Sequence, residues 1–370
     1  MKYFFCVSIL FLNWTVLAQE VTKKNLEEAP AKPATEKMEA PQADFSPSKS
    51  TKVVSKELVN DKSALTASRN NQLAQADLWV HSAYYTSLQQ REKRTLSQTE
   101  IEQINQAAAI YRKQDSKSFE ANYYTYIGHR YDMSYLPELQ RAIALNPDFI
   151  QAKYELLALY IANNKQASID SLANHIPKES WKMTYFRNLL QTIPQNATLL
   201  VHGLSDLPSL YTQLKNLNRS DITPVSLDVL AEKTIQSNLK AKGFQFPNSK
   251  VVDTAFFREF CQLNASKKCY LSFTFPSEYF EPLKKDLQIV GLTFAYKEAN
   301  MDVNKTNYQF YKEKWTHTDF VKQLTHAANK LKSNYLPALL SAKRFAQKMG
   351  YQEDEKALSE LINLLLTSKK

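Results

Sequence analysis

The sequence predicts a mixed α and α/β fold, in which helical hairpins are followed by a small, mostly parallel α/β sandwich and then by further helices. Three observations predict this fold. Apolar residues recur at three- and four-residue steps over residues 73–192 and again over residues 304–370, which is typical of amphipathic helices. Residues 193–303 instead alternate short apolar runs with helical patterns, as α/β structure does. Glycine is scarce, since the chain has 5 in 370 residues where average usage of about 7% gives roughly 26.

The scarcity of glycine argues against several classes of enzyme. Phosphate-binding loops and nucleophile elbows depend on closely spaced glycines, because glycine tolerates φ > 0 and close backbone approach at no steric cost. No two glycines are near neighbours here, and the chain has no G-x-G-x-x-G, G-x-x-x-x-G-K-S/T or G-x-S-x-G pattern. The 6 histidines are scattered and lack the spacing of metal ligands. We therefore expect no catalytic constellation, no metal site and no cofactor.

Residues 1–18 have the features of a signal peptide. Lys2 gives a short positive start, Tyr3–Leu17 is apolar apart from three polar residues, and Ala18 precedes a suitable cleavage point. The apolar run is too short and too interrupted for a membrane-spanning helix. We therefore expect an exported protein, periplasmic or extracellular, that is soluble after cleavage of the signal.

Residues 19–72 are predicted to form a disordered linker. Pro30, Pro33, Pro41 and Pro47 fall among Ala, Lys, Glu and Ser residues, and large apolar side chains are sparse. Such a segment cannot bury enough apolar surface to offset the loss of chain entropy on folding. We interpret it as a passive tail or, alternatively, as a tether.

Residues 73–192 are predicted to form a helical domain. Its segments have apolar faces with helical spacing, and its second helix opens on a Ser-Gln-Thr-Glu capping-box pattern at 97–100. The residues on these faces are Leu73, Ala76, Val80, Tyr84 and Leu88 in the first helix, Ile101, Ile104, Ala108 and Tyr111 in the second, and Tyr123, Tyr124, Ile127 and Tyr131 in the third.

The later helices of this domain resemble the tetratricopeptide repeat. Ala142 and Pro147 match the late Ala and Pro of that repeat, and Ala152, Leu156 and Tyr160 match early positions of the next copy. One well-matched copy and two degraded copies cover residues 118–176. The resemblance implies helical hairpins, packed for structure alone or, as the alternative, around a peptide-binding groove.

Residues 193–303 are predicted to form the α/β domain. Apolar runs and alternating patterns mark its strands, and amphipathic spacing marks the helices between them. Strand–helix–strand order repeated in this way favours parallel strands covered by helices. The predicted strands are 198–201, 222–230, 270–275 and 289–296, and the predicted helices lie at 207–217, around 256–260 and at 279–287.

The α/β domain also carries a resemblance to a known family. Pro194–Tyr211 contains a strand that ends in His-Gly-Leu-Ser-Asp, followed by a Leu-Pro-Ser-Leu-Tyr helix start. Ser-Leu-Asp-Val-Leu follows at 226–230, and Cys-Tyr-Leu-Ser-Phe at 269–273 precedes Leu-Gln-Ile-Val-Gly-Leu at 287–292. Together, over about residues 190–300, these segments resemble the soluble C-terminal region of multi-spanning envelope proteins whose membrane part is similar to protein O-mannosyltransferases. The resemblance implies a bacterial envelope setting and an α/β-plus-helical-repeat layout; this chain has no counterpart of the membrane part, so no glycosyl transfer is implied.

The turn His202–Asp206 is the best candidate for a ligand site. It follows a predicted strand and precedes a predicted helix, and open α/β sheets bind ligands outside the carboxyl ends of their strands. Asp228, at the end of the second predicted strand, would face the same crevice. The candidate ligand-binding residues are therefore His202, Ser205, Asp206 and Asp228. The alternative is a structural turn in which Ser205 and Asp206 cap the helix.

Cys261 and Cys269 remain after removal of the signal. Export permits a disulfide between them. Only a short polar segment between a helix and a strand separates the two residues, so closure is feasible but not compelled. Two free buried cysteines are an equal alternative.

The C-terminal helical hairpins, predicted over residues 304–370, begin with a strongly basic stretch. Residues 304–348 carry nine Lys or Arg residues against two acidic ones, with aromatic residues among them. This stretch could contact an anionic surface such as lipid headgroups or an anionic glycan, and a solvated helix face is the alternative. No nucleic acid partner is expected, because no nucleic-acid-binding motif accompanies the charge. The basic residues are Lys305, Lys312, Lys314, Lys322, Lys330, Lys332, Lys343, Arg344 and Lys348.

These observations favour a non-enzymatic, exported interaction or scaffold protein of the bacterial envelope, which binds a protein partner through its helical repeats. The alternative hypothesis is a glycan-linked enzyme or glycan-binding protein that uses the crevice at His202–Asp206.

Overall fold

The computed structural model describes residues 56–86, 95–297, 301–315 and 331–367, together with Phe320 and Leu324. The signal peptide predicted at 1–18 lies outside the described residues, as does the predicted linker up to residue 55. The basic residues Lys322 and Lys330 also lie outside them.

The first described helix is α2 (Lys56–Val80), which continues into the short π-helix η1 (His81–Thr86). It begins within the segment 19–72 that was predicted as a linker. The physical reason is that the prolines of that segment end at Pro47, and the residues that follow are mostly compatible with a helix. The apolar face predicted from the spacing is present, because Ala76, Val80 and Tyr84 are all buried.

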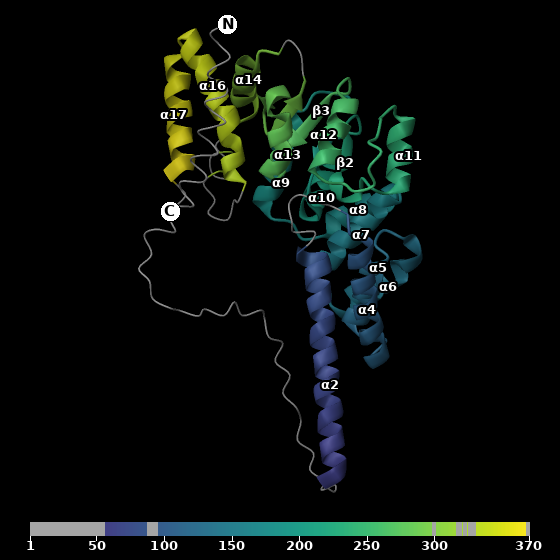
Figure 1. The fold of residues 1–370 in the computed structure, drawn as a ribbon. Helices are drawn as coiled ribbons and strands as arrows, with labels where there is room; N and C mark the ends of the chain where they lie inside the picture. The colour runs from purple at the N-terminus through teal and green to yellow at the C-terminus, as the bar shows by residue number, and fades with distance from the viewer. Residues whose placement is uncertain are drawn as a thin grey trace. The chain divides into compact units, whose positions relative to one another are not determined.

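A run of helices follows, and each of its members from α4 to α8 packs on the next. The predicted capping box opens α4, where the Glu100 backbone N–H donates to Ser97 Oγ and the Ser97 N–H donates to Glu100 Oε2 at 2.6 Å. The Asn-Pro break predicted at 146–147 separates α6 from α7. The helices are α4 (Gln98–Gln114), α5 (Phe119–Gly128), α6 (Leu136–Leu145), α7 (Ile150–Ala162), α8 (Gln166–His175) and α9 (Ser180–Thr192), shown from blue to teal in Figure 1.

The sheet has five strands in the order β2-β1-β3-β5-β4. β1 runs parallel to both β2 and β3, whereas β5 runs antiparallel to both β3 and β4. The predicted mostly parallel sheet is therefore a mixed sheet. The strands are β1 (Thr198–Val201), β2 (Thr223–Ser226), β3 (Cys269–Ser272), β4 (Leu287–Val290) and β5 (Thr293–Tyr296).

The antiparallel part arises from a hairpin at Gly291. The prediction of one strand over 289–296 was wrong, because the chain reverses at Gly291 and Leu292 to form β4 and β5. Gly291 has φ +57, a conformation that favours glycine, and a Cβ atom there would lie 2.3 Å from Thr192 Oγ1. Both the backbone conformation and the close approach of α9 thus require glycine at this turn.

Helices cover both faces of the sheet. Leu199 and Val201 lie in one core with residues of the helical run and of the C-terminal helices. Leu200 points to the other face, where it is in register with Leu271. On this second face the ring of Phe294 lies 4.7 Å from that of Phe280 on α13 (Ser277–Phe280).

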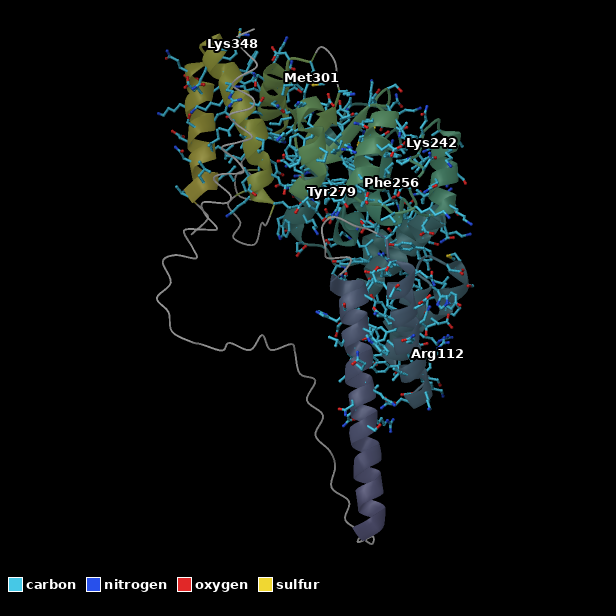
Figure 2. The ribbon with its side chains drawn as sticks, in the orientation of Figure 1. Arg112, Lys242, Phe256, Tyr279, Met301 and Lys348 are labelled. Atoms are coloured by element: carbon cyan, nitrogen blue, oxygen red, sulfur yellow. The ribbon has the colours of Figure 1, made fainter. Side chains whose placement is uncertain are left out.

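Further helices of the α/β part are α10 (Leu207–Asn216), α11 (Lys233–Ala241) and α12 (Thr254–Leu263). The predictions of helices at 207–217 and around 256–260 are confirmed by α10 and α12. Phe256 and Tyr279 lie in this part of the chain (Figure 2), and both are fully buried.

The C-terminal helices are α14 (Val303–Lys314), α16 (Leu336–Met349) and α17 (Gln352–Thr367). α16 ends at Gly350, whose φ of +73 matches the predicted helix stop. Buried Asn307 on α14 accepts a hydrogen bond from the Gly291 N–H and donates to the Ile289 carbonyl, each at 2.8 Å. These helices are thereby bound to the β4–β5 hairpin, and the described residues from Asn60 onward form one compact unit.

No helix in the described part of the chain combines the length and the apolar character that a membrane span requires.

Candidate functional site

The predicted turn at His202–Asp206 joins β1 to α10, as expected. Gly203 in this turn has φ +97, and its N–H donates to Asp228 Oδ2 at 2.8 Å. Ser226 Oγ lies 3.3 Å from the same carboxylate oxygen. The parallel pairing of β1 with β2 thus brings Asp228 to the turn, as the sequence predicts.

Three of the four predicted ligand residues, however, are buried, namely His202, Asp206 and Asp228. The imidazole of His202 is buried, with ring centroids 5.4 Å from those of both Phe275 and Tyr279. Asp206 is also buried, and its carboxylate forms an ion pair with Lys182 Nζ at 3.0 Å. Burial raises the pKa of Asp206, and Lys182 opposes that rise.

Ser205 is exposed and accepts hydrogen bonds from Lys182 Nζ on its backbone oxygen and on Oγ, at 3.1 and 3.2 Å. The Asp206 side chain makes no capping bond to α10, so the proposed capping role is absent. Asp228, also of the predicted set, lines a cavity.

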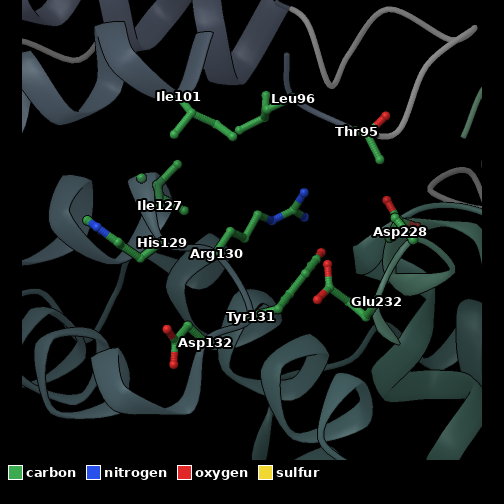
Figure 3. Close-up of a pocket in the computed structure, with 12 residues that line it drawn as sticks. Thr95, Leu96, Ile101, Ile127, His129, Arg130, Tyr131, Asp132, Asp228 and Glu232 are labelled. Carbon is green, nitrogen blue, oxygen red and sulfur yellow. The ribbon is translucent and has the colours of Figure 1, made fainter. Parts of the chain in front are cut away.

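This cavity has a volume of about 290 Å³. One wall comes from the turn after α5, residues 128–132, and from the segment 95–101 at the start of α4. The opposite wall comes from the segment after β2, with Asp228, Ala231 and Glu232. Figure 3 shows Arg130, Tyr131 and Glu232 pointing into the cavity, whereas His129 and Asp132 point away from it.

Arg130 supplies the positive charge of the cavity. Its Nε donates to both carboxylate oxygens of Glu155, at 2.9 and 3.1 Å, and Glu155 also accepts a 2.5 Å hydrogen bond from Tyr84 Oη. The Arg130 side chain is 8% exposed and that of Glu155 is 0% exposed. Burial alone would lower the pKa of Arg130, but the charge of Glu155 together with the hydroxyl groups of Tyr131 and Tyr84 outweighs burial and raises the pKa, so Arg130 stays charged. Its Nη2 atom is buried and has no hydrogen-bond partner among the described residues.

Tyr131 contributes a second donor. Its hydroxyl group is buried, and no described residue forms a hydrogen bond with it. Burial raises the pKa of Tyr131, so the phenol stays protonated. The Arg130 guanidinium lies 4.4 Å from the centroid of the Tyr131 ring. Tyr131 has φ +71, which is unfavourable for an aromatic residue, and its carbonyl accepts a hydrogen bond from Asn163 Nδ2 at 2.9 Å.

Glu232 completes the cavity at the start of α11. Its carboxylate does not cap that helix. Burial raises the pKa of Glu232, and the nearby charge of Arg130 opposes that rise. With Asp228, it places two carboxyl groups on the wall that faces Arg130 and Tyr131.

The sequence did not indicate Arg130, Tyr131 or Glu232 as site residues. Tyr131 was assigned to an apolar helix face, and no motif connects residues 130–131 with residues 228–232. The one available signal was the arginine at 130, directly after a strongly apolar helix, where an unpaired charge would be costly. A sequence pattern cannot show which distant segment faces such a residue.

Cys261 and Cys269 are both free and buried, so of the two predicted alternatives the structure shows the one without a disulfide. Burial raises the pKa of both thiols, that of Cys269 to about 12. Within the ranges that the structure describes, no group of three or more His, Cys, Asp or Glu side chains is arranged to hold a metal ion.

Comparisons of the chain with protein-family models, with curated proteins and with solved structures found no significant match.

Proposed function

We propose that this protein is a non-enzymatic, exported interaction or scaffold protein of the bacterial envelope. The observation that carries the proposal is the run of helices α4 to α8, in which each helix packs on the next. Stacked helices of this kind present long surfaces of exposed side chains, which helical-repeat proteins use to bind partners. The resemblance of residues 118–176 to the tetratricopeptide repeat supports the same role.

The envelope setting rests on the export signal predicted at 1–18 and on the family resemblance over residues 190–300. Both features come from the sequence. They support a search for the partner in the cell envelope.

Crosslinking in cells tests the proposal. A photo-reactive amino acid is placed at Gln106 on α4 or Gln140 on α6, and at Glu259 on α12 as the matched control; all three positions are exposed. We expect a defined protein adduct from the first two positions and none from the control, identified by mass spectrometry. Adducts from Glu259 alone, or none from any position, would contradict a partner-binding role for the helical run.

A glycan-binding role is the second candidate. It is supported by one observation, namely that Asp228 lines the cavity next to the Gly203 turn. Carboxylates accept hydrogen bonds from sugar hydroxyl groups, so Asp228 suits such a ligand. Of the other residues proposed for this role, His202 and Asp206 are buried in packing and in an ion pair. Binding of neutral sugars by the purified protein, weakened by Asp228→Asn, would support this candidate.

Contact with an anionic surface through the basic C-terminal stretch is a further proposal about partners. Arg344 and Lys348 are exposed one turn apart on α16, and Figure 2 shows Lys348 at the end of that helix. Lys312 is instead paired with Asp354 of α17 at 2.8 Å. Binding to anionic vesicles that is lost on raising the salt concentration would support the proposal, and no binding at low salt would reject it.

A further inference from the structure

The cavity between the α5 turn and α11 contains donors that the folded protein does not satisfy. Arg130 Nη2 and Tyr131 Oη are both buried and have no hydrogen-bond partner in the part of the chain that the structure describes. The two side chains are more than nine-tenths buried and point into the cavity (Figure 3). Buried polar groups in native proteins almost always have partners, so two adjacent exceptions in one cavity indicate that a ligand supplies an acceptor.

The wall opposite Arg130 and Tyr131 carries the carboxylate groups of Glu232 and Asp228. The charge of Arg130 is already balanced by Glu155, which accepts two hydrogen bonds from Nε. Glu232 therefore adds a further negative charge to the wall that faces Arg130, beside the carboxylate of Asp228. A ligand that fits must present a hydrogen-bond acceptor to one wall and a positive group to the other.

We propose that this cavity binds a small zwitterion, a free α-amino acid or a very short peptide. Its carboxylate accepts hydrogen bonds from Arg130 and Tyr131, and its ammonium group lies against Glu232 and Asp228. This inference goes beyond the partner-binding role and does not depend on it.

Other ligand classes fit less well. A simple anion would lie beside two carboxylates, and a simple amine would leave the buried donors of Arg130 and Tyr131 unpaired. A neutral sugar could pair with both walls but would not balance the charge of Glu232. The volume of about 290 Å³ lies at the lower end of the range for ligand pockets and suits an amino acid better than an oligosaccharide.

The unusual backbone of Tyr131 is consistent with this role. Its φ of +71 is strained for an aromatic residue, and strained residues of this kind cluster at ligand sites. The conformation turns the phenol toward the cavity, next to the guanidinium of Arg130 (Figure 3).

Isothermal titration calorimetry on the full chain tests the proposal with four classes of probe: the common L-amino acids and their dipeptides, acetate, ethylamine and D-glucose. We expect at least one amino acid or dipeptide to bind, and acetate and ethylamine to bind at least about tenfold more weakly, because each makes only half of the contacts. Binding of glucose without any amino acid would overturn the proposal in favour of a sugar site. No binding by any probe would overturn it as well.

Two isosteric variants locate the site. Tyr131→Phe removes the unpaired hydroxyl but keeps the ring and the backbone, and Glu232→Gln removes the charge. Each is expected to weaken amino-acid binding about tenfold or more without lowering the thermal midpoint of the ligand-free protein. The Tyr131 hydroxyl has no hydrogen-bond partner among the described residues, and burial raises the pKa of Glu232, so the fold disfavours the charge that Glu232→Gln removes. Binding that is unchanged in both variants would overturn the assignment.

Matched controls separate this effect from general destabilisation. Tyr296→Phe removes another buried hydroxyl without a hydrogen-bond partner, on β5 and outside the cavity. Glu259→Gln removes an exposed carboxylate on α12. Both are expected to leave the affinity for the amino acid unchanged. The crosslinking experiment on the helical run does not depend on whether an amino acid binds. The amino-acid site and the partner-binding role can therefore be rejected separately.

Discussion

The Arg130–Glu155 ion pair is the most deeply buried pair of opposite charges described in the helical run. Glu155 is fully buried on α7, and it accepts hydrogen bonds from both Arg130 and Tyr84. A buried pair of this kind contributes little net stability compared with apolar residues of the same size, because both charges lose their hydration. Removing one partner is costly, however, because the other charge remains buried without compensation.

We predict that Glu155→Gln lowers the free energy of unfolding by about 3–5 kcal/mol, because it leaves the Arg130 charge uncompensated. Urea unfolding followed by circular dichroism measures this change. The matched control is Glu138→Gln, which breaks an exposed pair with Arg141 on α6. Its expected cost is about 0.5 kcal/mol or less, as for surface ion pairs. Equal costs for the two variants would show that the Arg130–Glu155 pair does not behave as a buried one.

At the residue scale, the sequence predicted one part of the cavity and missed the other. Asp228 could be placed beside Gly203 because the carboxyl ends of neighbouring parallel strands meet at one edge of a sheet. Arg130 and Tyr131 could not be placed there, because the packing of α5 against the segment after β2 has no local signature. The burial of His202 against aromatic rings was also unpredictable, since those rings come from residues 275 and 279.

Among the elements, the β4–β5 hairpin depends on one glycine for both its backbone conformation and its packing. Gly291 adopts a positive φ and packs against Thr192, the last residue of α9. Gly350, at the end of α16, also has a positive φ, but a Cβ atom there would meet nothing within 4 Å. Substituting alanine at Gly350 therefore tests backbone strain alone, whereas substituting alanine at Gly291 tests backbone strain together with a steric clash.

We predict that Gly350→Ala lowers the free energy of unfolding by about 1 kcal/mol, the usual cost of a non-glycine residue at positive φ. Gly291→Ala should cost about 2–4 kcal/mol, because overpacking against Thr192 adds about 1–3 kcal/mol to the same strain. Urea unfolding of the two variants measures both values. A cost for Gly291→Ala no larger than that for Gly350→Ala would mean that α9 moves away from the hairpin at little cost.

Most elements of the α/β part could be predicted from sequence patterns, but the hairpin could not. The strand prediction at 198–201 is confirmed by β1, because a short apolar run between turn residues has few other solutions. Residues 289–296 form a nearly continuous apolar run, in which Gly291 is the single signal of a turn. α11 was missed because its hydrophobic content is low, and it buries only Leu239.

On the scale of the whole molecule, the C-terminal helices are part of the same core as the helical run and the sheet. Asn188 on α9 donates to Tyr335 Oη at 2.9 Å, and both residues are buried. Asn307 on α14 binds the backbone of the β4–β5 hairpin. The division at residue 303, which was predicted from the sequence, therefore falls within one compact unit.

We predict that residues 98–367 unfold in one cooperative transition. Trp181 on α9 and Trp315 after α14 are both buried and report on different regions. With Trp14 and Trp79 replaced by Phe, the variants Trp181→Phe and Trp315→Phe each keep one probe. In each variant, tryptophan fluorescence and far-ultraviolet circular dichroism should give the same urea midpoint. A separate, earlier fluorescence transition for the variant that keeps Trp315 would show that the C-terminal helices form an independent domain.

The position of β1 between its two parallel partners has a consequence for how the chain is made. Synthesis proceeds from the N-terminus, so β1 and β2 emerge well before β3, and β1 has an open apolar edge in the meantime. Pairing Thr198 with Cys269 then closes a loop on the order of 70 residues, at an entropic cost of about 4 kcal/mol. The helices of the first half form from local contacts and have no such delay. The interval before β3 joins the sheet is therefore the period in which the nascent chain is most exposed to aggregation.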